Sequence, residues 1–255
     1  MNKTILSKKD LEILEKILLS YGNIVSTEQI KAIFPDYSYD ELNQRIKFLA
    51  KRGWLVRIKR GFYAVASLES HSFADISPLV LAQIFIPDSY ISFEFALNHH
   101  GYFDQLPSKV TSVTSLKSKN YNFQNLNYQF VKAKPEMMVG FNETKINNHV
   151  SKIADTEKAF IDFLHFRKDG YTVDLVKEKL NEAKSDIDPV KLSNYSSPYP
   201  EALKRRLGFL LDSAGIDSKE IYNQIKKNSG NAKLTKNSNI FNSKWRLYYE
   251  DRFTK

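Results

Sequence analysis

Short amphipathic stretches separated by turn residues fill the first 53 positions, and their pattern predicts three helices. In each stretch apolar residues recur every three or four positions. Each is preceded by a serine with an acidic or amide residue three positions later, the spacing of a capping box: Ser7 with Asp10, Ser26 with Gln29, and Ser38 with Glu41. We expect the helices to end at residues that interrupt helical geometry, namely Gly22, Pro35 and Gly53.

The same periodicity predicts which side of each helix faces a core. The apolar stripe of the first helix comprises Leu11, Ile13, Leu14, Ile17 and Leu18. The second helix offers Ile30, Ile33 and Phe34, and the third offers Leu42, Ile46 and Leu49. On the third helix the polar and basic residues Asn43, Gln44, Lys47 and Lys51 fall on the opposite side. We therefore expect that side to face solvent or a polar partner.

Residues 54–65 change period and predict a β-hairpin. Apolar and basic residues alternate along this stretch, with a turn at Arg60-Gly61. Three short helices followed by a basic hairpin is the plan of a winged helix–turn–helix domain. In that plan the third helix enters the major groove of DNA, and the hairpin, or wing, lies along the backbone or minor groove. We predict such a DNA-binding domain over residues 1–66.

The charge distribution favours the same conclusion. The 255-residue chain carries 38 Lys and Arg against 29 Asp and Glu, a formal net charge of +9. From Arg45 to Arg60 basic residues are dense and acidic residues are absent, as expected where phosphates are bound. The amides could pair with adenine edges. The candidate DNA contacts are Tyr39, Asn43, Gln44, Lys47, Lys51, Arg57, Lys59 and Arg60. The alternative is a winged helix that binds protein and leaves its basic face solvated.

The remaining chain predicts a larger mixed α/β domain over residues 78–255, joined by a serine-containing linker at residues 67–77. Expected helices cover residues 78–85, 90–101 (capped by Ser92 and closed by Gly101), 155–165, 173–183 and 200–214, and expected strands cover residues 110–115, 128–131 and 137–141. The fold class is therefore α+β, with a small sheet and several helices. The Asn/Ser/Lys-rich stretch 228–243 is expected to be flexible.

Charged residues of this second domain allow two interpretations. On the helix 155–165, Glu157, Lys158 and Asp162 predict a solvated face rather than a catalytic group. Lys204 and Arg205 could contact nucleic acid or a protein partner, and so form an antitoxin surface. They could equally form the wet face of a helix that buries its leucines.

Searches for catalytic and metal-binding patterns point away from an enzyme. The chain has no cysteine, which excludes disulfides and thiolate sites. It has no phosphate-binding loop, no dinucleotide fingerprint, no nucleophile elbow and no paired-histidine zinc motif. A nuclease would need carboxylates on strands 110–115 and 128–131, which carry none. We expect no cofactor, no metal and no catalytic residue. Lacking a long apolar run, the chain is expected to be cytoplasmic without a membrane partner.

Four segments together resemble AbiEi-type antitoxins, the regulators of type IV toxin–antitoxin systems linked to abortive phage infection. The segment Arg60–Val65 is similar to the family's wing. The stretch from Tyr90 to Pro107, followed by Lys109–Ser115, is the most specific match. Ala154–Asp162 resembles a helix in which Thr156 stands where proline is frequent, and Arg205–Leu211 resembles a late Arg-Leu-Gly-x-Leu helix.

This resemblance implies two activities. The winged helix would repress its own operon by binding inverted repeats in the promoter, as a monomer or as a dimer on DNA. The larger domain would counteract a nucleotidyltransferase-type toxin without forming a stable complex with it. The alternative is a stand-alone transcription regulator whose second domain senses a ligand or dimerises.

Overall fold

The chain folds into two compact bodies. The computed structural model describes residues 6–66, 74–105, 107–146, 149–226 and 230–253. The N-terminal body comprises residues up to Leu81 together with Phe123–Asn125, and the C-terminal body comprises the rest. Most of the predicted linker, residues 67–73, lies outside the described residues.

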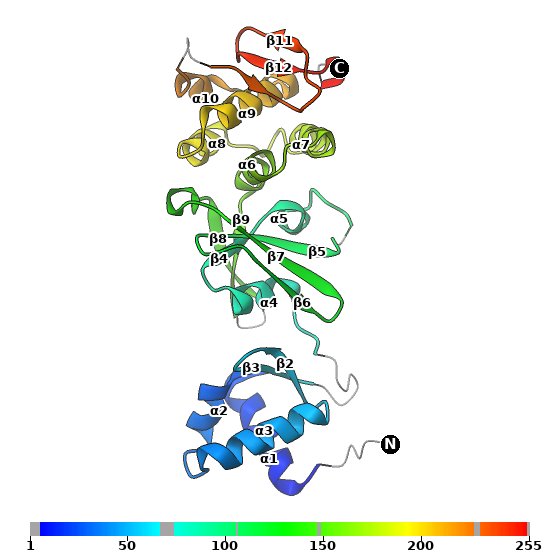
Figure 1. Ribbon diagram of the computed structural model, residues 1–255, viewed down its shortest axis with the longest axis vertical. Helices are drawn as coiled ribbons and strands as arrows, with labels where there is room; N and C mark the ends of the chain where they lie inside the picture. Colours follow the sequence, from blue (N-terminus) through cyan, green and yellow to red (C-terminus); the bar gives the residue numbers. More distant parts are fainter. Residues whose placement is uncertain (1–5, 67–73, 106, 147–148, 227–229, 254–255) are drawn as a thin grey trace. The chain divides into compact units, whose positions relative to one another are not determined.

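The N-terminal body contains the helices and the hairpin that the sequence predicts, plus one short strand. Its elements, shown in blue to cyan in Figure 1, are α1 (Lys8–Tyr21), β1 (Ile24–Ser26), α2 (Thr27–Ile33), α3 (Tyr39–Lys51), β2 (Leu55–Lys59) and β3 (Phe62–Val65). Capping boxes at Ser7, Ser26 and Ser38 start the three helices as predicted. The strands form an antiparallel sheet in the order β1-β3-β2.

One side of each helix packs into a single core, but the stripe predicted for α1 is partly wrong. Ile13, Leu14 and Ile17 are buried beside residues of α2, α3 and the sheet. Leu11 and Leu18 are exposed instead. The reason is geometric: both residues lie about 90° from the centre of the buried face, where a helix on the rim of a small body meets solvent.

The C-terminal body begins with a mixed sheet and its covering helices. Its first elements are α4 (Pro78–Phe85), which starts in the other body, β4 (Ser89–Ile91), α5 (Phe93–His99), β5 (Lys109–Thr114), β6 (Lys119–Phe123), β7 (Leu126–Lys132), the 3₁₀ turn η1 (Pro135–Met137), β8 (Phe141–Ile146) and β9 (His149–Ala154). The strand order is β6-β7-β5-β4-β9-β8. The pairs β5/β7 and β4/β9 are parallel, and the pairs β4/β5 and β8/β9 are antiparallel.

A helical layer and a small second sheet complete this body. They comprise α6 (Thr156–Phe166), α7 (Gly170–Glu182), α8 (Pro189–Ser196), α9 (Glu201–Ala214), α10 (Lys219–Asn223), β10 (Ala232–Lys233), β11 (Ile240–Asn242), β12 (Leu247–Tyr249) and the 3₁₀ turn η2 (Asp251–Phe253). In Figure 1 the helices α6–α10 lie between the six-stranded sheet and the small sheet. The fold class is α+β, as predicted.

Two predictions for this body are wrong, and a third is correct in part. The strand expected at residues 137–141 is a 3₁₀ turn followed by Gly140 at positive φ (75°), and β8 starts only at Phe141. The helix expected to be capped by Ser92 does start there, but the preceding Tyr90 and Ile91 belong to β4, a strand that the pattern did not predict. The stretch expected to be flexible carries β10 and β11 in its described part. Leu234 is buried there, so apolar burial orders a segment whose composition is polar.

Candidate nucleic-acid interface

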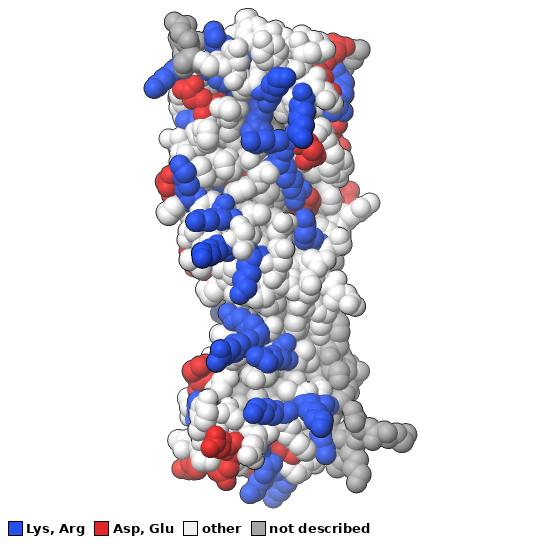
Figure 2. Space-filling view, viewed as in Figure 1, with Lys and Arg blue, Asp and Glu red and all other residues white. Residues whose placement is uncertain are grey.

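The outward side of α3 carries the predicted polar and basic residues. Leu42, Ile46 and Leu49 are buried. Helical geometry then places Gln44, Lys47 and Lys51 on the exposed side, with Asn43 half-buried at its margin. Among the described residues, Lys47 and Lys51 have no ion-pair partner. In Figure 2, Lys and Arg atoms gather near the end of α3, and acidic atoms gather near its start.

One residue of the basic run is not free to meet a phosphate. The Arg45 guanidinium pairs with the buried carboxylate of Asp10, with 2.9 Å between Nη1 and Oδ1. Burial raises the pKa of Asp10, but hydrogen bonds from Ser7 and Arg45 outweigh that effect and hold the pKa below its usual value. Arg45 therefore ties α3 to the start of α1 and has a structural role.

The start of α3 is more acidic than the basic run alone suggests. Asp40 and Glu41 lie in its first turn, and Glu41 accepts hydrogen bonds from the backbone and hydroxyl of Ser38. Tyr39 is 62% exposed, and the Lys31 ammonium lies 3.7 Å from its ring centroid. Acids at a helix N-terminus suit the macrodipole, so the cationic part of the surface begins one turn later.

The hairpin presents its basic residues beside a fixed turn. Arg57 and Arg60 are exposed, and the Lys59 ammonium lies 4.7 Å from the ring centroid of Phe62. The pairing of β2 with β3 shifts register between Arg57 and Lys59. The Thr27 backbone N–H donates to the Gly61 carbonyl at 2.8 Å and anchors the turn to α2. Since α3 packs against β2, the hairpin residues and the α3 residues belong to one rigid unit.

The C-terminal body contains a buried polar cluster that the sequence reasoning missed. The Asp162 carboxylate accepts hydrogen bonds from the Lys158 ammonium, from Ser92 at 2.8 Å, and from the hydroxyls of Tyr90 (3.0 Å) and Tyr199 (3.2 Å). Lys158 and Asp162 are both 0% exposed. Burial and the Asp162 charge raise the pKa of Tyr90 well above its usual value, and burial lowers the pKa of Lys158.

The expectation of a solvated face at Glu157, Lys158 and Asp162 is therefore wrong. The sequence did contain a signal for burial. Around Lys158 and Asp162, apolar residues occur on all sides of α6: Ala159, Phe160, Ile161, Phe163 and Leu164. A helix that is apolar all round is buried, and its charges are then buried and paired. The cluster joins β4, α6 and the segment before α9, and its groups satisfy one another.

Lys204 and Arg205 do not form a partner surface, which corrects the sequence prediction. Lys204 is 8% and Arg205 2% exposed. The Arg205 guanidinium donates to the carbonyls of Trp245 (3.0 Å) and Lys226 (3.3 Å), and the Lys204 ammonium donates to the carbonyl of Ser197 (3.0 Å). Both basic residues fasten α9 to neighbouring chain segments.

The Arg205–Leu211 motif contains a glycine, Gly208, because the ring of Trp245 leaves no room for a side chain there. A Cβ atom there would lie 2.1 Å from the Trp245 ring. Trp245 is fully buried, and its indole N–H donates to Asp212 at 2.7 Å. The Arg205–Leu211 motif thus describes how α9 holds the small C-terminal sheet.

Other candidate chemistry is sparse. Within the described ranges, no group of three or more His, Asp or Glu residues is arranged to hold a metal ion. The helices formed by these residues lack the length and apolar character needed to cross a membrane.

Comparison with known proteins gives a fold relationship. No protein-family model and no curated protein sequence matches the chain. Among solved structures, the chain is similar to the crystal structure of RV2827C protein from Mycobacterium tuberculosis, with a TM-score of 0.68 over 98% of this chain and 94% of that one. The two sequences are 14% identical, so the likeness concerns the fold.

Proposed function

We propose that the N-terminal body is a winged helix–turn–helix domain and that the protein is a transcription regulator that binds duplex DNA. The observation that carries this proposal is a pair of exposed lysines on the outward side of α3, Lys47 and Lys51, which form no ion pair with any residue that the structure describes and have Asn43 and Gln44 beside them. The arginine-bearing hairpin packs in the same rigid unit. A protruding basic helix beside a basic hairpin suits the major groove and its flanking phosphates.

In this proposal different residues contact the phosphates and the bases of the DNA. Lys47, Lys51, Arg57 and Arg60 neutralise phosphates and supply most of the affinity. The amides of Asn43 and Gln44 contact base edges, where bidentate pairing favours adenine. Lys59 and Tyr39 lie at the margins and contact the backbone. Arg45 is left out because Asp10 holds it.

The biological role that we propose is an autorepressor and antitoxin of a type IV toxin–antitoxin system. Its support is the resemblance of four segments to AbiEi-type antitoxins. The functional partner would be a nucleotidyltransferase-like toxin, countered without a stable complex. Autorepression would use inverted repeats in the promoter, so that two copies occupy one operator. The alternative is a stand-alone regulator whose C-terminal body senses a ligand or dimerises.

A binding titration against the chain's own upstream DNA tests the DNA-binding proposal. The full chain would be titrated onto a labelled duplex at several salt concentrations. We expect Lys47→Ala with Arg57→Ala to weaken binding and to lower the slope of log K against log salt by about 0.9 for each lost phosphate contact. Lys8→Ala with Lys16→Ala removes the same charge from α1 and should leave the slope unchanged. Equal slopes for all three proteins would refute the proposed interface.

Co-expression tests the antitoxin role separately. The protein would be expressed together with the product of the adjacent gene, and growth would be followed. Rescue of growth by the wild type and also by the Lys47→Ala, Arg57→Ala variant would assign antitoxin activity to the C-terminal body. A non-toxic neighbour, or no rescue, would favour the stand-alone regulator.

A further inference from the structure

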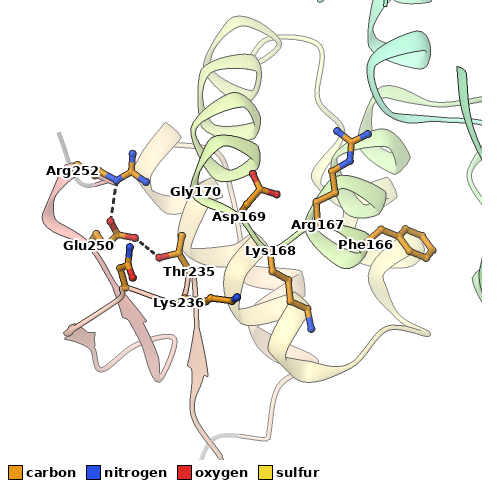
Figure 3. A pocket seen from close by; sticks show the side chains of 10 residues that line it. Phe166, Arg167, Lys168, Asp169, Gly170, Thr235, Lys236, Glu250 and Arg252 are labelled. Atoms are coloured by element: carbon orange, nitrogen blue, oxygen red, sulfur yellow. Dashed lines mark hydrogen bonds and ion pairs between the residues drawn. The ribbon is translucent and has the colours of Figure 1, made fainter. Parts of the chain in front are cut away.

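Three hollows on the C-terminal body are neighbours, since each shares a lining residue with the next, and together we call them the belt. The first, about 560 Å³, lies between the α6–α7 turn and the small C-terminal sheet (Figure 3). The second, about 450 Å³, shares Arg167 with the first. The third, about 330 Å³, lies on strands β5–β7 and shares Lys109 with the second. Each hollow falls within the size range of pockets that accept a small organic group.

The belt carries lysines whose charge is uncompensated. Lys168 and Lys236 line the first hollow, and Lys109 lines the other two. All three are exposed, and none is ion-paired with a residue that the structure describes. Figure 3 shows Lys168 and Lys236 reaching toward the same space from different elements, while Arg167 points away from them. The three ammonium groups therefore remain available to an anionic ligand.

The other charges of the belt are already engaged. Arg167 forms a two-pronged pair with Glu94, whose second contact is 3.1 Å. Arg252 pairs with Asp174 at 2.7 Å and Glu250 at 3.1 Å. The Asp169 carboxylate caps α7 by accepting from the backbone and hydroxyl of Thr172, both at 2.9 Å. The acids of the belt thus have partners of their own.

An aromatic ring and a group of amides lie between the lysines. Tyr171 lines the second hollow and is 69% exposed. The third hollow is lined by amide side chains, and the parallel register of β5 with β7 places Lys109 beside Asn127. The amides there are Asn120, Asn122, Asn127 and Gln129.

We propose that this belt binds single-stranded nucleic acid, an activity separate from duplex recognition by the N-terminal body. Spaced cations follow a phosphate backbone, an exposed aromatic ring stacks on a base, and amides contact base edges. A duplex stacks its bases inside and offers no free base to the Tyr171 ring or to the separate hollows. A run of acidic residues in a peptide would use the lysines but carries no flat ring to stack on Tyr171.

Anisotropy titrations of the full chain with labelled 12-nucleotide single strands, one RNA and one DNA of mixed sequence, test this proposal. We expect Lys109→Glu, Lys168→Glu and Lys236→Glu together to weaken binding at least about tenfold and to lower the salt slope by about 0.7 per lost contact. The control triple Lys145→Glu, Lys184→Glu and Lys219→Glu has the same net charge and should change affinity less than about threefold. Tyr171→Ala should cost about fivefold or more, and Tyr171→Phe should retain stacking.

Several outcomes separate this proposal from others. The Lys47→Ala, Lys51→Ala variant should keep its affinity for single strands. The variant with all three belt lysines changed to Glu (the belt triple) should keep its affinity for duplex DNA. The two proposed binding surfaces are therefore tested independently. Equal losses in the belt and control triples would show a general charge effect and overturn the belt. Unchanged binding in Tyr171→Ala, together with displacement by a poly-glutamate peptide, would overturn it in favour of an acidic-peptide surface. A preference for the RNA or the DNA strand identifies the ligand.

Discussion

Helices α3 and α9 both carry neighbouring basic residues on an amphipathic pattern, yet they use them in opposite ways. On α3, Lys47 and Lys51 extend into solvent without a partner among the described residues. On α9, Lys204 and Arg205 are buried and donate to backbone carbonyls. The periodicity of each helix marks one apolar side correctly. The two helices differ in how many of their sides are covered by other parts of the protein.

The surroundings of each helix account for the difference. α3 lies on the surface of a small body and packs against its core from one side. α9 contacts α6 and α7 as well as β10 and β12, which come from a segment of polar composition. A basic residue on the second side of such a helix must be hydrogen-bonded inside the protein. Basic charge on a helix therefore indicates a ligand surface only where the second side stays uncovered.

Removing the Asp162 carboxylate is expected to have the largest effect. Asp162→Ala leaves the Lys158 ammonium fully buried without its counter-ion, and such a change costs about 3–5 kcal/mol of folding free energy. Urea unfolding of the full chain measures it. Replacing both partners, as Lys158→Met with Asp162→Leu, should cost clearly less than the single change. A single variant as stable as wild type would show that the pair is not held as the structure describes.

The next largest effect is expected at Gly208. A glycine-to-alanine change in an exposed helix stabilises it by up to about 1 kcal/mol. At Gly208 the added methyl group meets the Trp245 ring, so we expect a loss of about 1–3 kcal/mol. Thermal unfolding measures the change, and a blue or red shift of Trp245 fluorescence reports the displaced ring. Stabilisation by Gly208→Ala would mean that the small sheet is not fastened to α9.

The helices and the hairpin of the N-terminal body were predictable because the sequence signals for them act over only a few residues. Capping boxes act over three residues, and a hairpin needs only its own two strands and turn. The outward residues of α3 follow from the same helical period that marks its buried side. The pairing of Arg45 with Asp10 spans 35 residues of sequence, so no local pattern reveals it, although it removes one cation from the candidate interface.

The C-terminal body was less predictable because its order depends on distant neighbours. The strands β6, β8 and β9 are short, and polar residues make up about half of each or more. They become strands by pairing with a buried centre of the sheet. In the same way β10 and β11 are ordered around two buried residues, Leu234 and Trp245, and Trp245 packs where α9 offers a glycine. The belt joins residues of β5, β6, β7 and α7 with Lys168 and Lys236 from two loops, which the sequence does not place together.

An intermediate effect is expected at Asp10, and it should depend on pH. The pKa of Asp10 is lowered in the folded chain, so folding favours the ionised carboxylate. Its contribution is present above the ordinary pKa of about 3.9 and is lost as the pH falls through the folded value. At pH 7, Asp10→Asn should destabilise by about 1–2 kcal/mol, and this difference should shrink near pH 3. The exposed Glu15→Gln change on the same helix should show neither effect.

The smallest effect on stability, and the sharpest test of the comparison, is expected within α3 itself. Lys47 and Arg45 are two residues apart in one basic run, but within the described part of the chain only Arg45 of the two has an ion-pair partner. Lys47→Ala should change stability by less than about 0.5 kcal/mol and lower the salt slope of duplex binding by about 0.9. Arg45→Ala should do the reverse, lowering stability by about 1 kcal/mol while leaving the slope unchanged. Urea unfolding and the salt titration, applied to both variants, separate the two roles. If both variants lower the salt slope of duplex binding equally, Arg45 exchanges Asp10 for a phosphate when DNA binds. A cation that is paired in the free protein would then still belong to the DNA interface when its side of the helix is uncovered.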